Sequence, residues 1–271
     1  MASSPVKFAR PPVTEVVFSV AFSVPQPIRT VDIGTFWHTV ASDFPSIEEV
    51  APVSQVIESM SPESQGLVNL DFESVPPLRR VWLVSSDSRT LLQIQGDRFM
   101  FNWRKLPGDP DLAYPGNVWI MSNFWKYWAA FEKFLLSIPV GQPTVLQLEH
   151  SYFNAIADVD KLSSDLGGVL IDHQLSIHAN RFLPIPEQFR WATSYLLPSN
   201  VGRLHVVAQS AKLTQSGEPI VRLEMTARGL PSSTDNDSLA AWFEVSHVWI
   251  TRGFSDITRS DAHNMLWGRV S

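Results

Sequence analysis

Residues 79–104, RRVWLVSSDSRTLLQIQGDRFMFNWR, decide the fold of this chain. Three runs rich in β-branched and aromatic residues, at 79–85, 90–95 and 98–104, are typical of strands. Ser86-Asp87-Ser88 and Gly96-Asp97 separate the runs and have the composition of tight turns. The segment therefore predicts an antiparallel meander of three strands.

Alternation within the middle run predicts how the sheet is covered. Leu92 and Ile94 alternate with Gln93 and Gln95, so the four side chains divide between the two faces. We expect one buried face and one wet face.

Further elements are expected on either side of the meander. Before it, the pattern predicts a strand at 13–22, a helix that carries Phe36, Trp37, Val40 and Phe44 and is capped by Asp32 or Thr35, a weaker strand at 51–60 and a loop at 61–77. After it, the pattern predicts a helix at 118–137, a strand at 145–157, a short helix at 160–171 and an extended segment at 174–182. Three strands at 189–197, 203–213 and 220–227 are expected next, followed by a long helix capped by Ser238. Residues 258–261 fit a capping box before a terminal turn.

The order of these elements runs twice, which predicts an α+β protein with two similar lobes, residues 1–140 and 141–271. Each lobe reads β-α-β(n)-α, with an antiparallel sheet and its helices on one face. This order resembles the duplicated saddle of the TATA-box-binding protein fold. A resemblance in element order carries no function.

Composition narrows the classes of function. The formal net charge is −6 and the sequence pI is about 5.6, so nucleic acid is an unexpected partner. The chain has no cysteine, which excludes disulfides, a thiol nucleophile and Cys-ligated metal sites. No apolar run has the length of a membrane span, and the first residues do not resemble a signal peptide. These features predict a cytoplasmic protein without membrane attachment.

The run at 98–105 is the densest group of polar and aromatic residues. On a strand, Arg98, Asn102 and Arg104 share one face, with Lys105 following them. Such a face could hold an anion or the acidic patch of a partner, because arginine presents a planar fork. A solvated strand face would explain the same residues.

A second group lies in the strand at 145–157. His150, Tyr152 and Asn154 share one face of it. They could form a small polar site, or a buried hydrogen-bond network that fixes the register of the sheet.

Motifs for metal or covalent chemistry are missing from the sequence. His173 and His178 have poor spacing for a metal, and His247 and His263 are expected to pack or to cap helices. No HExxH motif, phosphate-binding loop or nucleophile elbow occurs, so neither a metal nor a cofactor is expected.

Three segments, PPVTEVV at 11–17, FNWRK at 101–105 and YFNAI at 152–156, resemble a sporadically distributed bacterial protein family that has no assigned activity. The likeness covers nearly the whole chain and implies no catalytic or ligand-binding residue. The patchy distribution of that family implies an accessory gene, for example in phage defence or a toxin–antitoxin system.

The leading hypothesis is a non-enzymatic protein that binds a protein partner or a second copy of itself, because aromatic residues are abundant and no catalytic constellation occurs. The alternative is a sensor for a small anion or nucleotide. Arg98, Arg104 and Lys105 would supply its positive field and Trp103 or Tyr152 would stack a base, in a pocket where residues 98–105 meet 150–154. An enzyme that uses His150 or Glu149 as a general base is the least supported reading.

Overall fold

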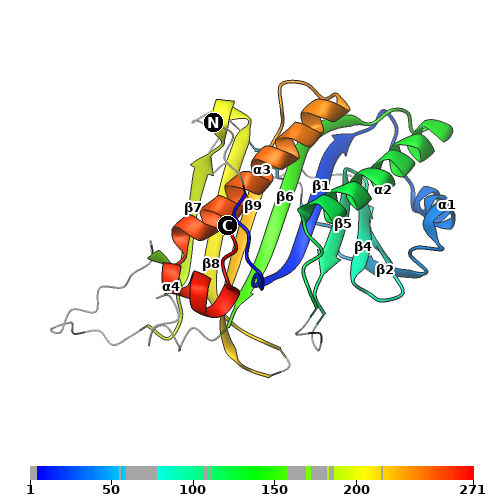
Figure 1. Cartoon of the computed structure of the whole chain (residues 1–271). Helices are drawn as coiled ribbons and strands as arrows, with labels where there is room; N and C mark the ends of the chain where they lie inside the picture. Colours follow the sequence, from blue (N-terminus) through cyan, green and yellow to red (C-terminus); the bar gives the residue numbers. More distant parts are fainter. Residues whose placement is uncertain are drawn as a thin grey trace.

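A single antiparallel sheet of nine strands organises the protein (Figure 1). The computed structural model describes residues 5–54, 56–58, 78–106, 109, 112–157, 169–171, 182, 186–214 and 216–271. The strands are β1 Val13–Ser23, β2 Ser46–Val50, β3 Arg80–Val84, β4 Thr90–Gln95, β5 Arg98–Arg104, β6 Thr144–Ile156, β7 Arg190–Leu196, β8 Gly202–Lys212 and β9 Pro219–Gly229. Their order across the sheet is β2-β3-β4-β5-β1-β6-β9-β8-β7.

The meander is confirmed, because β3, β4 and β5 are antiparallel neighbours. The two halves of the chain also share this one sheet. β1 pairs with β6, with Phe18 opposite His150 and Val16 opposite Tyr152. The α+β class is therefore confirmed, with the N-terminal strands on one side of the β1–β6 pair and the C-terminal strands on the other.

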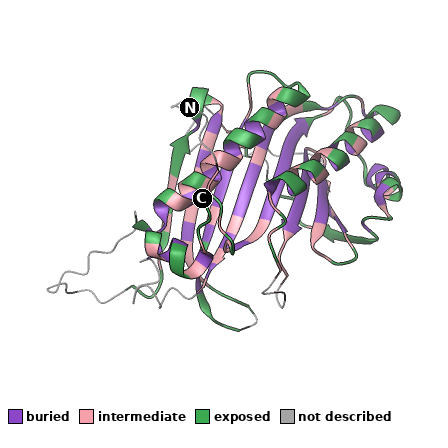
Figure 2. Ribbon diagram, viewed as in Figure 1, coloured by how far each residue is buried: buried purple, intermediate pink, exposed green. Residues whose placement is uncertain are grey.

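Two long helices cover one face of the sheet, α2 Asn117–Ser137 and α3 Asn236–Ile257 (Figure 1). The inner stripe of α2 is buried and consists of Ile120, Phe124, Trp128, Phe131 and Leu135. The helical spacing of these residues predicts this stripe, and their rings pack on β5, where the Phe99 and Phe131 centroids lie 5.1 Å apart. Figure 2 shows buried residues along the central strands and exposed residues on the outer sides of both helices. The shorter helices are α1 Thr30–Val40 and α4 Ser260–Ala262.

The opposite face of the sheet is polar but largely buried, so the prediction of a wet face is wrong. Gln93 and Gln95 are each only 6% exposed. The chain after β2 crosses this face, and the prediction of a strand at 51–60 is wrong for its described residues, 51–54 and 56–58. Val53 exchanges two hydrogen bonds of 2.9 Å with the side chain of Gln95, and the Glu58 backbone donates to Gln147 Oε1 at 2.6 Å. Side-chain amides thus satisfy backbone groups that a strand ladder would otherwise pair.

The predicted caps of the helices are also corrected. α1 begins at Thr30, and Asp32 lies inside its first turn, where it accepts the Arg29 backbone N–H at 2.9 Å. Asp235 rather than Ser238 caps α3, because the Ser238 backbone donates to its carboxylate at 2.9 Å. Thr258 forms no capping box. Its hydroxyl donates to the Phe254 carbonyl and ends α3.

Several predicted features fall outside the described residues. These are the loop at 61–77, the helix at 160–171 except for its last three residues, the extended segment at 174–182 except for Phe182, and both His173 and His178.

Candidate functional site

The two predicted groups of site residues lie on opposite faces of the sheet. Successive residues of a strand alternate between faces. β6 directs His150, Tyr152 and Asn154 toward the helices, whereas β5 directs Arg98, Asn102 and Arg104 to the polar face. β1 also separates the two strands. The expected pocket between residues 98–105 and 150–154 therefore forms only in part: Ser151 and Phe153 line the polar face together with residues of β5, whereas Tyr152 and Asn154 lie on the other face.

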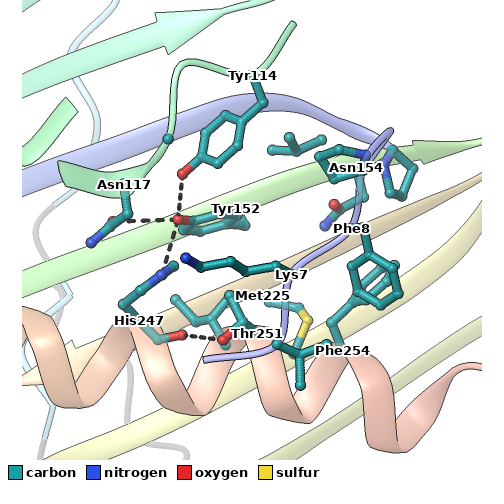
Figure 3. Close-up of a pocket in the computed structure, with 16 residues that line it drawn as sticks. Lys7, Phe8, Tyr114, Asn117, Tyr152, Asn154, Met225, His247, Thr251 and Phe254 are labelled. Atoms are coloured by element: carbon teal, nitrogen blue, oxygen red, sulfur yellow. Dashed lines mark hydrogen bonds between the residues drawn. The ribbon is translucent and has the colours of Figure 1, made fainter. Parts of the chain in front are cut away.

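Each group of predicted site residues lines a pocket on its own face. The helix-side pocket has a volume of about 320 Å³ and is lined by the N-terminal arm, the start of α2, β6 and the middle of α3 (Figure 3). The polar-face pocket has a volume of about 340 Å³ and is lined by β3, β4, β5, β1 and β6. Trp103 belongs to the helix side, where its ring centroid lies 5.4 Å from that of Tyr114.

The walls of the helix-side pocket are mostly apolar. They include Val6, Phe8, Pro11, Pro12, Val13, Met225, Ile250 and Phe254. The arm that forms one wall is fastened to the C-terminal residues, because the backbone N–H groups of Ala9 and Arg10 donate to the Gly268 and Trp267 carbonyls at 2.9 Å. One wall of the pocket is therefore held in place by backbone hydrogen bonds to the C-terminal residues.

A polar cluster centred on Tyr152 forms the base of this pocket (Figure 3). The Tyr152 hydroxyl lies 2.8 Å from the Tyr114 hydroxyl, 3.2 Å from His247 Nδ1 and 3.4 Å from Asn117 Oδ1. Tyr152 itself is only 6% exposed. Three partners, two from residues 114–117, where α2 begins, and one from α3, thus converge on one hydroxyl group.

Burial keeps this cluster neutral at pH 7. It raises the pKa of Tyr152 well above its usual value and also raises the pKa of Tyr114. Burial, and then the charge of Lys7, lowers the pKa of His247 to about 4. Each group stays uncharged because the low-polarity surroundings penalise its ionised form. The cluster can therefore donate and accept hydrogen bonds without carrying charge.

His150 lies beneath the pocket and is fully buried. Ser246 donates its hydroxyl proton to the Phe243 carbonyl at 2.7 Å, so its oxygen accepts from His150 Nδ1–H, also at 2.7 Å. His150 Nε2 is then the unprotonated nitrogen, and it has no hydrogen-bond partner in the described part of the chain. The bond to Ser246 links β6 to α3, and the His150 ring also packs against Phe18 of β1 with centroids 4.1 Å apart.

Two positive features face the helix-side pocket. Lys7 extends across it toward Tyr152 and His247 (Figure 3). The N-terminus of α2 opens onto it at Gly116 and Asn117, with no side-chain cap and no acidic residue in its first turn. Unpaired N–H groups and the helix dipole make such an end favourable for an anion.

The polar-face pocket contains a chain of hydrogen bonds between side chains. Arg80 donates to Gln93 at 2.9 Å, Gln93 donates to Asn102 at 2.8 Å, and Asn102 donates to Glu15 at 2.6 Å. Asn102 is thus a structural link in this network. Burial, the dominant effect, raises the pKa of Glu15.

Three other predicted residues are placed by their own contacts. Arg104 donates its Nε–H to the Ser88 carbonyl at 2.7 Å while it lines the polar-face pocket. Lys105 lies just beyond β5, and its backbone donates to the Thr14 carbonyl at 2.7 Å. Asn154 lines the helix-side pocket and donates to the Leu223 carbonyl at 3.2 Å.

The sequence patterns did not point to Lys7, Tyr114, Asn117 or Arg80, and they predicted a packing or capping role for His247. One available signal was Pro115-Gly116 before the α2 helix, which lacks the Ser, Thr or Asp cap that helices commonly have. No protein-family model matches the chain, and a search of curated proteins found no match. Among the described residues, no group of three or more His, Asp or Glu side chains could hold a metal ion, and no helix is both long and apolar enough to cross a membrane.

Proposed function

We propose that the helix-side pocket binds a small, mostly apolar molecule with one carboxylate end. The main support is the pocket of about 320 Å³, in which apolar walls meet the neutral polar cluster of Tyr152 beside Lys7. Ligand sites commonly have this character, with an apolar lining and a few convergent polar groups.

The apolar part of the ligand would lie between α3 and the N-terminal arm, against Ile250, Phe254 and Phe8. The carboxylate would lie toward Lys7 and the uncapped start of α2, where it gains both a counter-ion and N–H donors. His247 and Tyr152 are neutral at pH 7 and can complete its hydrogen bonds without repelling it.

Binding fits this pocket better than chemistry. Thr251, the hydroxyl side chain that lines it from α3, donates to the His247 carbonyl at 2.9 Å. The raised pKa of Tyr152 and the lowered pKa of His247 make the tyrosine a weak acid and the histidine a weak base.

A small anionic ligand is also what the alternative hypothesis from the sequence expects, but here different residues bind it. Tyr152 and Asn154 remain in the site, whereas Arg98, Arg104 and Lys105 leave it. Two earlier expectations remain predictions. One is that the protein binds a protein partner or a second copy of itself, and the other is that it is encoded by an accessory gene.

We also infer that the two halves are a duplication. β1 and β6 lie side by side at the centre, each half contributes a meander, and α2 and α3 follow their meanders. A matching strand order on both sides of the β1–β6 pair is what a duplicated saddle requires.

Isothermal titration calorimetry with three probes tests the ligand class. Octanoate should bind, octanol should bind more weakly, and octylamine should not bind, because only octanoate matches both the apolar walls and Lys7. Lys7→Gln should weaken octanoate binding and leave octanol binding unchanged, with Lys133→Gln on the exposed side of α2 as the matched control.

A variant that fills the pocket separates this site from surface binding. Thr251→Phe places a ring in the cavity and should abolish octanoate binding while the far-ultraviolet circular dichroism stays unchanged. Equal binding of octanoate and octylamine, or octanoate binding that survives Thr251→Phe, contradicts the proposal.

A further inference from the structure

Two arginines on the polar face lack a counter-ion. Arg98 is only 5% exposed, and no hydrogen bond or ion pair joins its side chain to any described residue. Its Nε is buried without a partner, as is the Nε of Arg80 in the same pocket. Arginine stays charged at all ordinary pH values, so Arg98 cannot relieve its burial by losing a proton.

The acidic groups of this face are engaged elsewhere. Glu149 pairs with Arg228 at 2.5 Å, and Glu58 pairs with both Arg203 and His205. Glu15, which lines the polar-face pocket, accepts from Asn102. Asp97, which precedes Arg98, accepts from the Gln95 side chain at 2.9 Å. Among the described residues, no ion pair joins Arg98 or Arg80 to a carboxylate.

The charge on Arg80 is also uncompensated. Its Nη1 donates to the neutral Gln93, and its guanidinium lies 5.5 Å from the centre of the Trp82 ring. Burial, and then the nearby Arg98 charge, lowers the pKa of Arg80, so the two cations repel each other. A buried charge without a partner costs several kcal/mol in general, and two adjacent like charges add to that cost.

We propose that the polar-face pocket binds the phosphate group of a small molecule, held between the guanidinium groups of Arg98 and Arg80. A dianionic phosphate supplies the missing negative charge, and its oxygens match the forked N–H donors of two arginines. The pocket volume of about 340 Å³ leaves room for a group attached to the phosphate. Met100, Leu91 and Phe153 would contact this group, because they form the apolar wall of the same pocket.

The crossing segment after β2 is part of this site. Val53 lines the pocket and is fixed to Gln95 by two hydrogen bonds, and Gln95 is the register partner of Arg98. The segment therefore lies beside the arginine end of the pocket and forms one edge of the site.

The first test is titration of the wild-type protein with inorganic phosphate, followed by calorimetry and by ¹H–¹⁵N spectra of the arginine Nε–Hε groups. Phosphate should bind and shift two of these signals, those of Arg98 and Arg80, whereas chloride at equal ionic strength should shift neither. Absence of binding to the wild-type protein overturns the proposal without any variant.

Variants then locate the site. Arg98→Met and Arg80→Met keep the length of the side chain and remove the charge, and each should weaken phosphate binding by roughly tenfold or more. Arg190→Gln, which changes an exposed arginine on β7, is the matched control and should bind phosphate as the wild type does. Loss of binding in the control, or unchanged binding in both methionine variants, overturns the assignment.

Stability without phosphate gives an independent readout. An arginine held by an ion pair within the protein would destabilise the fold when replaced. Arg98→Met should instead have a urea midpoint equal to or above that of the wild type in phosphate-free buffer, and below it at saturating phosphate. A lower midpoint in both buffers contradicts an unpaired Arg98. An unchanged far-ultraviolet circular dichroism spectrum checks that the variant is folded.

Discussion

The neutral state of His247 makes the stability of the protein depend on pH. Burial and Lys7 lower the folded-state pKa of His247 from 6.5 to about 4. The unfolded chain therefore binds a proton first as the pH falls, and stability present above pH 6.5 is lost progressively toward pH 4. Between pH 7 and pH 5, linkage gives a loss of about 2 kcal/mol from this one side chain.

Urea denaturation at pH 7 and pH 5 measures this loss for the wild type and for His247→Gln. The variant keeps a polar side chain on α3 but removes the titration, so its loss between the two pH values should be smaller by about 2 kcal/mol. His38→Gln, at an exposed position on α1, is the matched control and should lose as much stability as the wild type.

Comparing the loss of unfolding free energy between pH 7 and pH 5 in the three proteins separates the contribution of His247 from those of the other titrating groups. His150, whose pKa burial also lowers, contributes in the same direction, and Glu15, whose pKa burial raises, contributes in the opposite direction. Glu15 is unaffected by the substitution and cancels in the difference, whereas His150 keeps its burial, the larger effect, and loses only the smaller effect of the His247 charge. An equal pH dependence in the wild type and His247→Gln would refute the reasoning, because the histidine would then titrate alike in the folded and unfolded states.

Three further predictions concern the fold. Phe18→Ala should lower the free energy of unfolding by about 3–5 kcal/mol, because Phe18 is fully buried against Phe124 and Phe243. Phe182 is 96% exposed, so Phe182→Ala should change it by less than about 0.5 kcal/mol. Urea denaturation measures both changes. Gly229→Ala should lower the free energy of unfolding by more than about 2 kcal/mol in the same assay, since an added Cβ would lie 1.9 Å from the Val201 carbonyl oxygen. In Gly34→Ala on α1 the added Cβ meets no atom within 4 Å, so this change should raise the free energy of unfolding by about 0.5–1 kcal/mol. Tyr152→Phe should cost about 1 kcal/mol and lower the thermal midpoint, because its hydroxyl joins Tyr114 and His247, and an unchanged midpoint would mean that the cluster does not stabilise the fold.

Local signals predicted most of the elements in this chain. The bounds of β4 and β5 agree with the predicted runs at 90–95 and 98–104, because Gly96-Asp97 fixes the turn and a two-residue period fixes the faces. The same period correctly grouped Arg98, Asn102 and Arg104, and separately His150, Tyr152 and Asn154. Such patterns act over a few residues and are therefore visible in the sequence.

The crossing segment could not be predicted in this way. The hydrogen bonds of Val53 and Glu58 go to Gln95 and Gln147, which are 42 and 89 residues away along the chain. Their partners are side-chain amides, so the segment has no strand pattern of its own. The burial of Gln93 and Gln95 is likewise a product of the assembled fold.

By itself, the sequence determined the antiparallel meanders, the amphipathic helices and the face on which each strand residue lies, since sterics and hydrophobic periodicity set these locally. The tertiary structure alone decided that β1 pairs with β6, that Tyr152 meets Tyr114 and His247, and that Arg98 and Arg80 line one pocket. Those outcomes depend on contacts between segments that are distant along the chain, and the free energy of such contacts comes from burial and pairing that exist only after folding.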